Sequence, residues 1–185
     1  FATDFIKEMI DFINVLIDKD AAYVANGNVL FRVKSFKNYG ILSERIIQEQ
    51  DSGSRVDVET YKEDPNDFTL WKPSTDDEPG WDSPWGLGRP GWHLECSVMS
   101  EIVLGVPFDI HGGGNDLKFP HHDNEIAQTC AYHSNESAES FAKYWFHNGF
   151  LNLDNEKMSK SLGNVVYIDD LKKNFKGNEI RLALL

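Results

Sequence analysis

The chain has 185 residues, of which 41% are hydrophobic and 26% charged, a balance typical of a globular protein built around one core. Its net charge of −12 argues against a dedicated nucleic-acid-binding module and against binding to anionic membranes. Only two cysteines, Cys96 and Cys130, argue against a disulfide scaffold and favour a reducing compartment. The sequence has no apolar run long enough to cross a membrane and no signal-peptide pattern, so we expect a cytoplasmic protein.

The first elements are predicted from the spacing of apolar residues. Residues 3–19 carry apolar side chains at helical spacing, which predicts an amphipathic helix. Residues 23–25 and 29–33 flank Asn26-Gly27, a strong signal for a β-hairpin. Residues 51–91 lack periodicity but are rich in tryptophan. We expect an ordered, irregular segment there, held against a neighbouring surface by its tryptophans.

The second half of the chain alternates between helical and strand patterns. The predicted elements are a helix over 93–104 that stops at Gly105, a strand over 108–110, a helix from Pro120 to His133, a buried strand over 141–146, a polar turn over 155–164, and helices starting near Asp169 and Asn178. This alternation predicts a parallel sheet and an α/β fold.

Three residues form a candidate metal site. His121 and Glu125 are four positions apart on a predicted helix, so their side chains share a face. Cys96 lies early in another predicted helix. Thiolate, imidazole and carboxylate together suit zinc better than magnesium or calcium, and three protein ligands leave a position open for a substrate. The alternative is that Cys96 is a small buried apolar residue and that His121 is satisfied by water.

Two further stretches could bind a nucleotide. Gly112 to Gly114 follow a predicted strand, where a ligand can approach the backbone, and Asp116 could accept hydrogen bonds from ribose hydroxyls. The alternative is a sharp turn. Residues 157–164 hold two lysines and two serines in a polar turn, which could wrap a phosphate group or simply be a solvated loop.

Four sequence strings resemble a known family. Residues 157–161 read KMSKS, the second motif of class I aminoacyl-tRNA synthetases. GRPGWHLECS at 88–97, DIHGGG at 109–114 and FPHHDNEI at 119–126 closely resemble cysteinyl-tRNA synthetases, and the resemblance covers essentially the whole chain. It implies an α/β fold that is part of a Rossmann catalytic domain. Residues 1–20 would end its first half, 21–91 would be a connective insertion with a hairpin, and 92–185 would be the second half with the KMSKS loop.

The resemblance also implies a reaction. Cysteine would be activated by ATP, with magnesium, to cysteinyl-adenylate and then transferred to its tRNA, while zinc selects the substrate thiolate. The matching residues are Cys96, His121 and Glu125 as three of four zinc ligands, Trp92 in the cysteine pocket, Lys160 on ATP with Lys157 assisting, and His111, Gly114 and Asp116 near the nucleotide or adenylate. His93 and His122 are structural candidates or would orient the ligands.

Two pieces of the family pattern are absent from these residues: the HIGH motif and the fourth zinc ligand, which in the family is a cysteine further upstream. We therefore expect a piece of a longer protein, inactive on its own, whose tRNA contacts lie mostly outside it. No membrane partner is expected, and a monomer is the simplest oligomeric state. Two alternatives stay open, namely the related cysteine ligase of mycothiol synthesis, which needs no tRNA, and a non-catalytic zinc-stabilised module.

Overall fold

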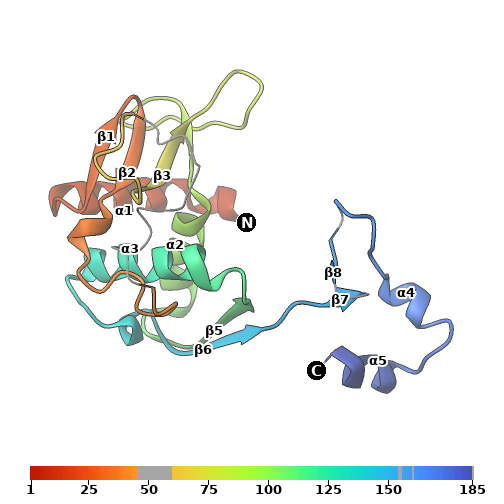
Figure 1. Cartoon of the computed structure of the whole chain (residues 1–185). Coiled ribbons are helices and arrows are strands. Elements are labelled where there is room, and N and C mark those ends of the chain that lie inside the picture. The colour runs from red at the N-terminus through yellow and green to blue at the C-terminus, as the bar shows by residue number, and fades with distance from the viewer. Residues whose placement is uncertain (46–59, 154–155, 160, 185) are drawn as a thin grey trace. The chain divides into compact units, whose positions relative to one another are not determined.

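A computed structural model describes residues 1–45, 60–153, 156–159 and 161–184 (Figure 1). The chain divides into two compact units, Phe1–Phe146 and His147–Leu185, and each is described by itself. The first unit begins with the 3₁₀ turn η1 (Ala2–Phe5) and helix α1 (Ile6–Asp18). The apolar stripe of α1 is buried through Met9, Phe12, Ile13 and Leu16, which confirms the predicted amphipathic helix.

An antiparallel sheet of four strands follows α1. Its strands are β1 (Ala22–Ala25), β2 (Asn28–Phe31), β3 (Phe68–Pro73) and β4 (Gly88–Pro90), and they pair in chain order. Asn26 and Gly27 join β1 to β2 with φ values of 48° and 74°, the positive pair that a tight hairpin turn requires. The predicted hairpin is therefore confirmed. The short 3₁₀ turn η2 (Val33–Ser35) comes directly after it.

The tryptophan-rich segment is more regular than predicted. It supplies β3 and β4, where an irregular segment is predicted. Neither strand has a clear local pattern, because β3 buries successive residues and β4 is only three residues long. The role expected of the tryptophans is confirmed. Trp71 in β3 is fully buried, and Trp81 and Trp85 pack against the core around it. Residues 46–59 lie outside the described part of the chain.

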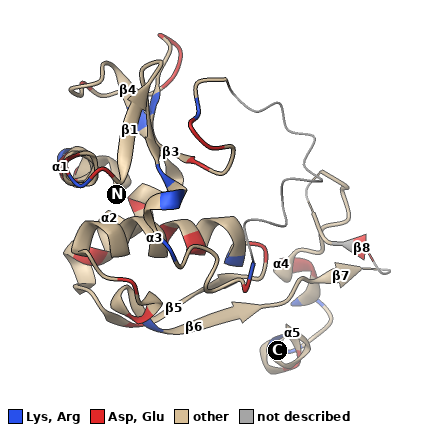
Figure 2. Ribbon diagram, turned by 60° about the vertical axis from the view of Figure 1, so that its left-hand side comes forward, with Lys and Arg blue, Asp and Glu red and all other residues tan. Residues whose placement is uncertain are grey.

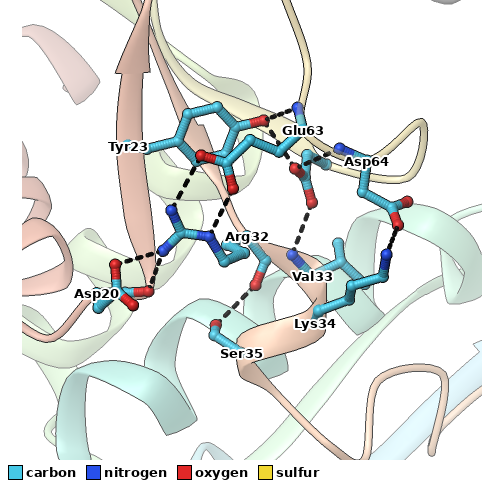
Figure 3. Close-up of polar contacts among 9 residues, drawn as sticks. Asp20, Tyr23, Arg32, Val33, Lys34, Ser35, Glu63 and Asp64 are labelled. Atoms are coloured by element: carbon cyan, nitrogen blue, oxygen red, sulfur yellow. Dashed lines mark hydrogen bonds and ion pairs between the residues drawn. The ribbon is translucent and has the colours of Figure 1, made fainter.

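A network of ion pairs ties residues 63–67 to the hairpin (Figure 3). The Arg32 guanidinium lies between Asp20 and Glu63, with N–O distances of 2.6 and 2.9 Å. Lys34 pairs with Asp64 at 2.7 Å. Asp67 accepts hydrogen bonds from the Tyr23 hydroxyl and from the Val33 amide. The chain that returns to the sheet before β3 is thus fixed by charges as well as by burial.

Two helices lie between the antiparallel sheet and a second pair of strands in both ribbon views (Figures 1 and 2). They are α2 (Trp92–Leu104) and α3 (Asp123–His133), and both also contact α1. Helix α2 ends at Gly105, whose φ is 74°, as the sequence predicts. Figure 2 shows acidic and basic residues scattered along the ribbon of the first unit rather than gathered in one basic stripe.

The second pair of strands is parallel. Strand β5 (Phe108–Gly114) and strand β6 (Ala142–Asn148) point the same way in Figure 1, and α3 forms the crossover between them. The Phe108 amide donates to the carbonyl of Phe141, the residue before β6, and further along the two strands Asp109 pairs with Lys143 at 2.8 Å. This β–α–β unit confirms the predicted parallel α/β arrangement.

The parallel strands differ from the prediction in two ways. Strand β5 continues through the three glycines, so these residues form no turn. Strand β6 is not fully buried, because its side chains alternate between two faces and those of Tyr144 and Phe146 are 70% and 67% exposed. An apolar run alone does not separate a strand buried on both faces from one buried on a single face.

The helix predicted from Pro120 begins with a wider turn. The turn η4 (Lys118–His122) is closed by a hydrogen bond from the His122 amide to the Leu117 carbonyl, and Phe119 within it has extended backbone angles. Regular helix starts only at Asp123 and ends at His133, where the prediction placed its end. The 3₁₀ turn η5 (Ala138–Ser140) leads from α3 into β6.

The second unit is small. It contains the antiparallel strands β7 (Asn152–Leu153) and β8 (Glu156–Lys157) and the helices α4 (Ile168–Leu171) and α5 (Gly177–Leu184). The helices predicted near Asp169 and Asn178 are confirmed. Ile180 is the single buried residue among those described in this unit. Within the described residues, every helix is too short or too polar to cross a membrane.

Candidate metal and nucleotide site

Three elements of the first unit bring the predicted metal ligands together. Cys96 comes from α2, His121 from η4 and Glu125 from the first turn of α3, and their ligand atoms all lie within 4.8 Å of one another. The side chains of His121 and Glu125 are almost completely buried, and Cys96 is partly buried. One sulfur, one nitrogen and one carboxylate oxygen thus converge in a space of the size that a zinc ion requires.

The Glu125 carboxylate lies between two imidazoles. Its Oε1 is 2.9 Å from Nε2 of His121, and its Oε2 is 2.8 Å from Nε2 of His111. Burial alone would raise the pKa of Glu125, but the hydrogen bonds from His111 and His121 outweigh burial and lower it to about 2. The carboxylate is therefore ionised at neutral pH, the state that a metal ligand requires.

The Cys96 thiol is in the opposite state. Burial raises its pKa to about 12, and the nearby Glu125 carboxylate contributes to this rise. A thiol of this kind is protonated at neutral pH unless a cation binds beside it, and a dication reverses that balance because it stabilises the thiolate. The set of donors fits zinc, which takes thiolate, imidazole and carboxylate ligands.

Histidine side chains surround this centre more densely than the sequence reading anticipated. His93 and His121 face each other with 2.6 Å between their Nδ1 atoms, so one of these two atoms carries a proton. Burial, and then the neighbouring His121, lower the pKa of His93 to about 4, so His93 is neutral at neutral pH. This contact orients the His121 ring and leaves its Nε2 facing Glu125.

A second group of ligand atoms shares Glu125. His111, His122 and Glu125 also lie within 4.8 Å of one another. The sequence predicts His111 near the nucleotide and His122 as a residue that is structural or orients the ligands. The structure brings both into the histidine cluster. The rings of Phe141 and Trp145 pack against His111, with centroids 5.5 and 4.9 Å from that of His111.

The Trp92 side chain lies beside the predicted metal ligand His121 and is largely exposed. Its ring lies 4.2 Å from that of His121, measured between centroids, yet 58% of the residue is exposed. A buried packing tryptophan would be covered on both faces. An exposed ring beside His121 leaves room for a ligand, but a role for Trp92 in the cysteine pocket stays a prediction.

Packing alone explains why β5 ends in three glycines. A Cβ on Gly112 would lie 2.8 Å from the Phe146 carbonyl, and one on Gly113 would lie 3.2 Å from the His122 ring. A Cβ on Gly114 would approach the Asp116 carboxylate. The close approach of β6 and of the histidine cluster therefore already requires small residues here. A nucleotide role for Gly114, Asp116 and His111 stays a prediction.

The KMSKS residues belong to the second unit. The Ser159 amide donates to Oδ1 of Asn164 at 2.8 Å, and the Ser159 and Ser161 hydroxyls are 3.1 Å apart, so a polar turn closes as predicted. Gly163 has a φ of 68°, which suits glycine in this turn. Lys160 lies outside the described residues, as does the side chain of Lys157. Their predicted phosphate contacts therefore stay predictions.

Buried polar residues on α2 and α3 escaped the sequence reading. Gln128 is fully buried and donates from Nε2 to the His93 carbonyl and to the Ser97 hydroxyl, both at 2.6 Å. These bonds hold α2 against α3, and so hold Cys96 near Glu125. The available signal was the composition of residues 123–130, where polar side chains lie all round a helix that the fold must bury.

Comparison with known proteins identifies the class to which this fold and site belong. The profile described as "tRNA synthetases class I (C) catalytic domain" matches residues 1–185, and the chain belongs to this family of class I synthetase catalytic domains. Among curated proteins, it is 56% identical over 184 residues to the cysteine–tRNA ligase of Maricaulis maris and 57% identical over 185 residues to that of Pelagibacter ubique. Both alignments cover 100% of this chain but only 39% and 40% of the relatives, so the chain spans about two fifths of their length.

Proposed function

We propose that this chain is the part of a cysteine–tRNA ligase that selects the substrate cysteine. The complete enzyme would join cysteine to ATP, releasing pyrophosphate and forming cysteinyl-adenylate, and would then pass the cysteinyl group to its tRNA. The observation that carries the proposal is the convergence of Cys96, His121 and Glu125 beside the exposed ring of Trp92. The names of the relatives support tRNA as the acceptor rather than an amino sugar.

Selection of cysteine follows from the ligand set. Cysteine and serine differ little in size, so pocket shape separates them weakly, whereas a bound zinc ion favours a thiolate strongly over a neutral hydroxyl. In this chain Cys96, His121 and Glu125 would hold that ion. His111 and His93 would orient the carboxylate and the imidazole, and Trp92 would cover one side of the substrate.

The remaining roles concern ATP. We propose that Lys160, assisted by Lys157, stabilises the charge that develops as pyrophosphate leaves. Magnesium would accompany ATP, and Gly114, Asp116 and His111 would lie along the adenosine of the adenylate. The two cysteines are unpaired in the structure, which supports the cytoplasm as the compartment of the reaction.

A pair of cysteine substitutions tests the proposal in the full-length protein. Cys96→Ser should lose most of the bound zinc and raise the KM for cysteine, because a hydroxyl is a poor zinc ligand. Cys130→Ser is the control, since Cys130 is buried in α3 with its sulfur 3.2 Å from the Ser140 hydroxyl and lies outside both ligand groups. Metal analysis together with cysteine-dependent ATP–pyrophosphate exchange gives the answer. Unchanged zinc content in Cys96→Ser would contradict the ligand assignment.

The ATP role is tested separately. Lys160→Ala in the full-length protein should lower the rate of ATP–pyrophosphate exchange while zinc stays bound, because the lysine would act on the phosphates and not on the metal. Exchange at the unmodified rate would refute the assignment of Lys160 and leave the zinc assignment standing.

A further inference from the structure

The geometry of the zinc ligands depends on a junction that helical hydrogen bonds alone do not fix. His121 lies in η4 and Glu125 in α3, so this pair spans the change from the wide turn to the regular helix. Phe119, two residues before His121, has extended backbone angles of −137° and 134°. Something outside the helix must therefore hold the short stretch 119–125 in one conformation.

Residues 39–45, which follow the hairpin, contact both ends of that stretch. At its far end, the Tyr39 hydroxyl donates to Oδ1 of Asn124 at 2.5 Å, and the Leu42 amide donates to Oδ1 of Asp123 at 3.1 Å. At its near end lies Phe119. The Tyr39 ring packs edge-on against the Phe119 ring with 6.3 Å between centroids, and the Arg45 guanidinium lies 4.3 Å from its centre.

These contacts are specific rather than incidental. Tyr39, Asp123 and Asn124 are all buried. If one of their hydrogen bonds were lost, a polar atom would be left with neither a protein partner nor water. Burial raises the pKa of Tyr39, which keeps the phenol neutral and able to donate. Gly40 has a φ of 85°, and a Cβ there would lie 2.4 Å from the Arg45 carbonyl, so the turn within 39–45 depends on glycine.

We propose that residues 39–45 position the zinc ligands, with Tyr39 as the principal positioning residue, by holding Phe119 and the first turn of α3 so that His121 and Glu125 face the same point. This inference rests on the proposed function, because it assumes that these side chains bind the metal that selects cysteine. It assigns a role in substrate selection to a segment that supplies none of the proposed metal ligands. Partners that orient metal ligands commonly change metal affinity by about 10- to 100-fold.

The test compares two substitutions that remove the same atom. Tyr39→Phe deletes the hydroxyl that bonds Asn124, and Tyr23→Phe deletes the hydroxyl that bonds Asp67 in the network of Figure 3. Both would be made in the full-length protein, with zinc affinity measured by chelator competition and the ligand field read from the absorption bands of the cobalt-substituted form. Arg45→Met, which removes only the cation above Phe119, serves as a milder second variant.

We expect Tyr39→Phe to weaken zinc binding about tenfold, to shift the cobalt bands, and to raise the KM for cysteine while that for ATP changes little. Arg45→Met should move the same measurements in the same direction by less, and Tyr23→Phe should leave them unchanged. If the unmodified protein binds no zinc, the proposed function itself fails. If it binds zinc and the two tyrosine variants are alike, the proposed function stands and the positioning role is overturned.

Discussion

At the scale of single residues, Trp92 is the side chain that we propose covers the substrate cysteine. Trp92→Ala should raise the KM for cysteine by about tenfold in the full-length protein, because the ring beside His121 would no longer cover the bound amino acid. The free energy of unfolding should change little, since 58% of the residue is already exposed. Steady-state kinetics with both substrates and a thermal melt check this. An equal rise in the KM for ATP would contradict a role at cysteine alone, and Trp92→Phe should restore part of the loss.

A substitution at Gly112 distinguishes a role in strand packing from a role in nucleotide binding. Gly112→Ala should destabilise the first unit by about 1–3 kcal/mol, because the added Cβ would lie 2.8 Å from the backbone carbonyl of Phe146 in the paired strand. Gly149→Ala is a matched control, since nothing lies within 4 Å of a Cβ there. Urea unfolding measures the difference. If Gly112→Ala keeps the stability of the unmodified protein but loses ATP affinity, the glycine serves the ligand and not the strand pair.

The ligand set could be anticipated from sequence only in part. The spacing of His121 and Glu125 on one helix indicates a shared face. Cys96 was added to this pair because zinc prefers thiolate, imidazole and carboxylate ligands. The contacts that orient these ligands could not be predicted in the same way. His93 meets His121 and His111 meets Glu125 across different elements, and such pairs arise only when the helices and β5 pack together.

At the scale of elements, the charged network around Arg32 makes stability depend on pH. Burial would raise the pKa of Asp64, but hydrogen bonds from Lys34 and Asn66 outweigh it and lower the pKa below the usual 3.8. The contribution of Asp64 to stability is therefore complete above about pH 4 and is lost as the pH falls through the lowered pKa. The Arg32 guanidinium acts on the pKa of Glu63 in the same direction, chiefly by hydrogen bonding.

Asp64→Asn should therefore flatten the acid limb of the stability curve. Between about pH 5 and pH 2.5 the melting temperature of the first unit should fall less in this variant than in the unmodified protein, because the variant has no lowered pKa at this position to lose. Asp18→Asn, at the exposed end of α1, is the control and should leave the slope unchanged. Equal slopes in all three proteins would mean that the Asp64–Lys34 pair does not stabilise the fold.

Elements with strong local signals were predicted and those without were not. The hairpin at Asn26-Gly27 and the end of α2 at Gly105 followed from turn and cap residues. Strands β3 and β4 did not, because β3 pairs with β2, which lies about 40 residues earlier, and β4 pairs with β3, so that the sheet rather than local spacing decides the pairing. The wide turn η4 was also missed, since packing around Phe119 overrides the helical pattern there.

At the scale of the whole molecule, the two units differ greatly in buried apolar surface. The unit Phe1–Phe146 contains residues from all three predicted segments and holds nearly every buried apolar side chain of the described residues. Among the described residues of the unit His147–Leu185, Ile180 is the one buried apolar side chain. Since apolar burial supplies most of the free energy of folding, the first unit should carry the cooperative unfolding of this 185-residue chain.

Hydrogen exchange on the 185-residue chain tests this division and its link to the metal. Amides of α1, α3 and β2 should exchange slowly and those of α4 and α5 quickly, because the latter helices have little buried surface to keep them closed. Added zinc at 100 times its dissociation constant should stabilise the folded first unit by about 2.7 kcal/mol and slow exchange there by about 100-fold, with little effect on α4 and α5. Equal slowing in both units would show that they unfold together, and no slowing anywhere would show that zinc does not bind these residues in the folded chain.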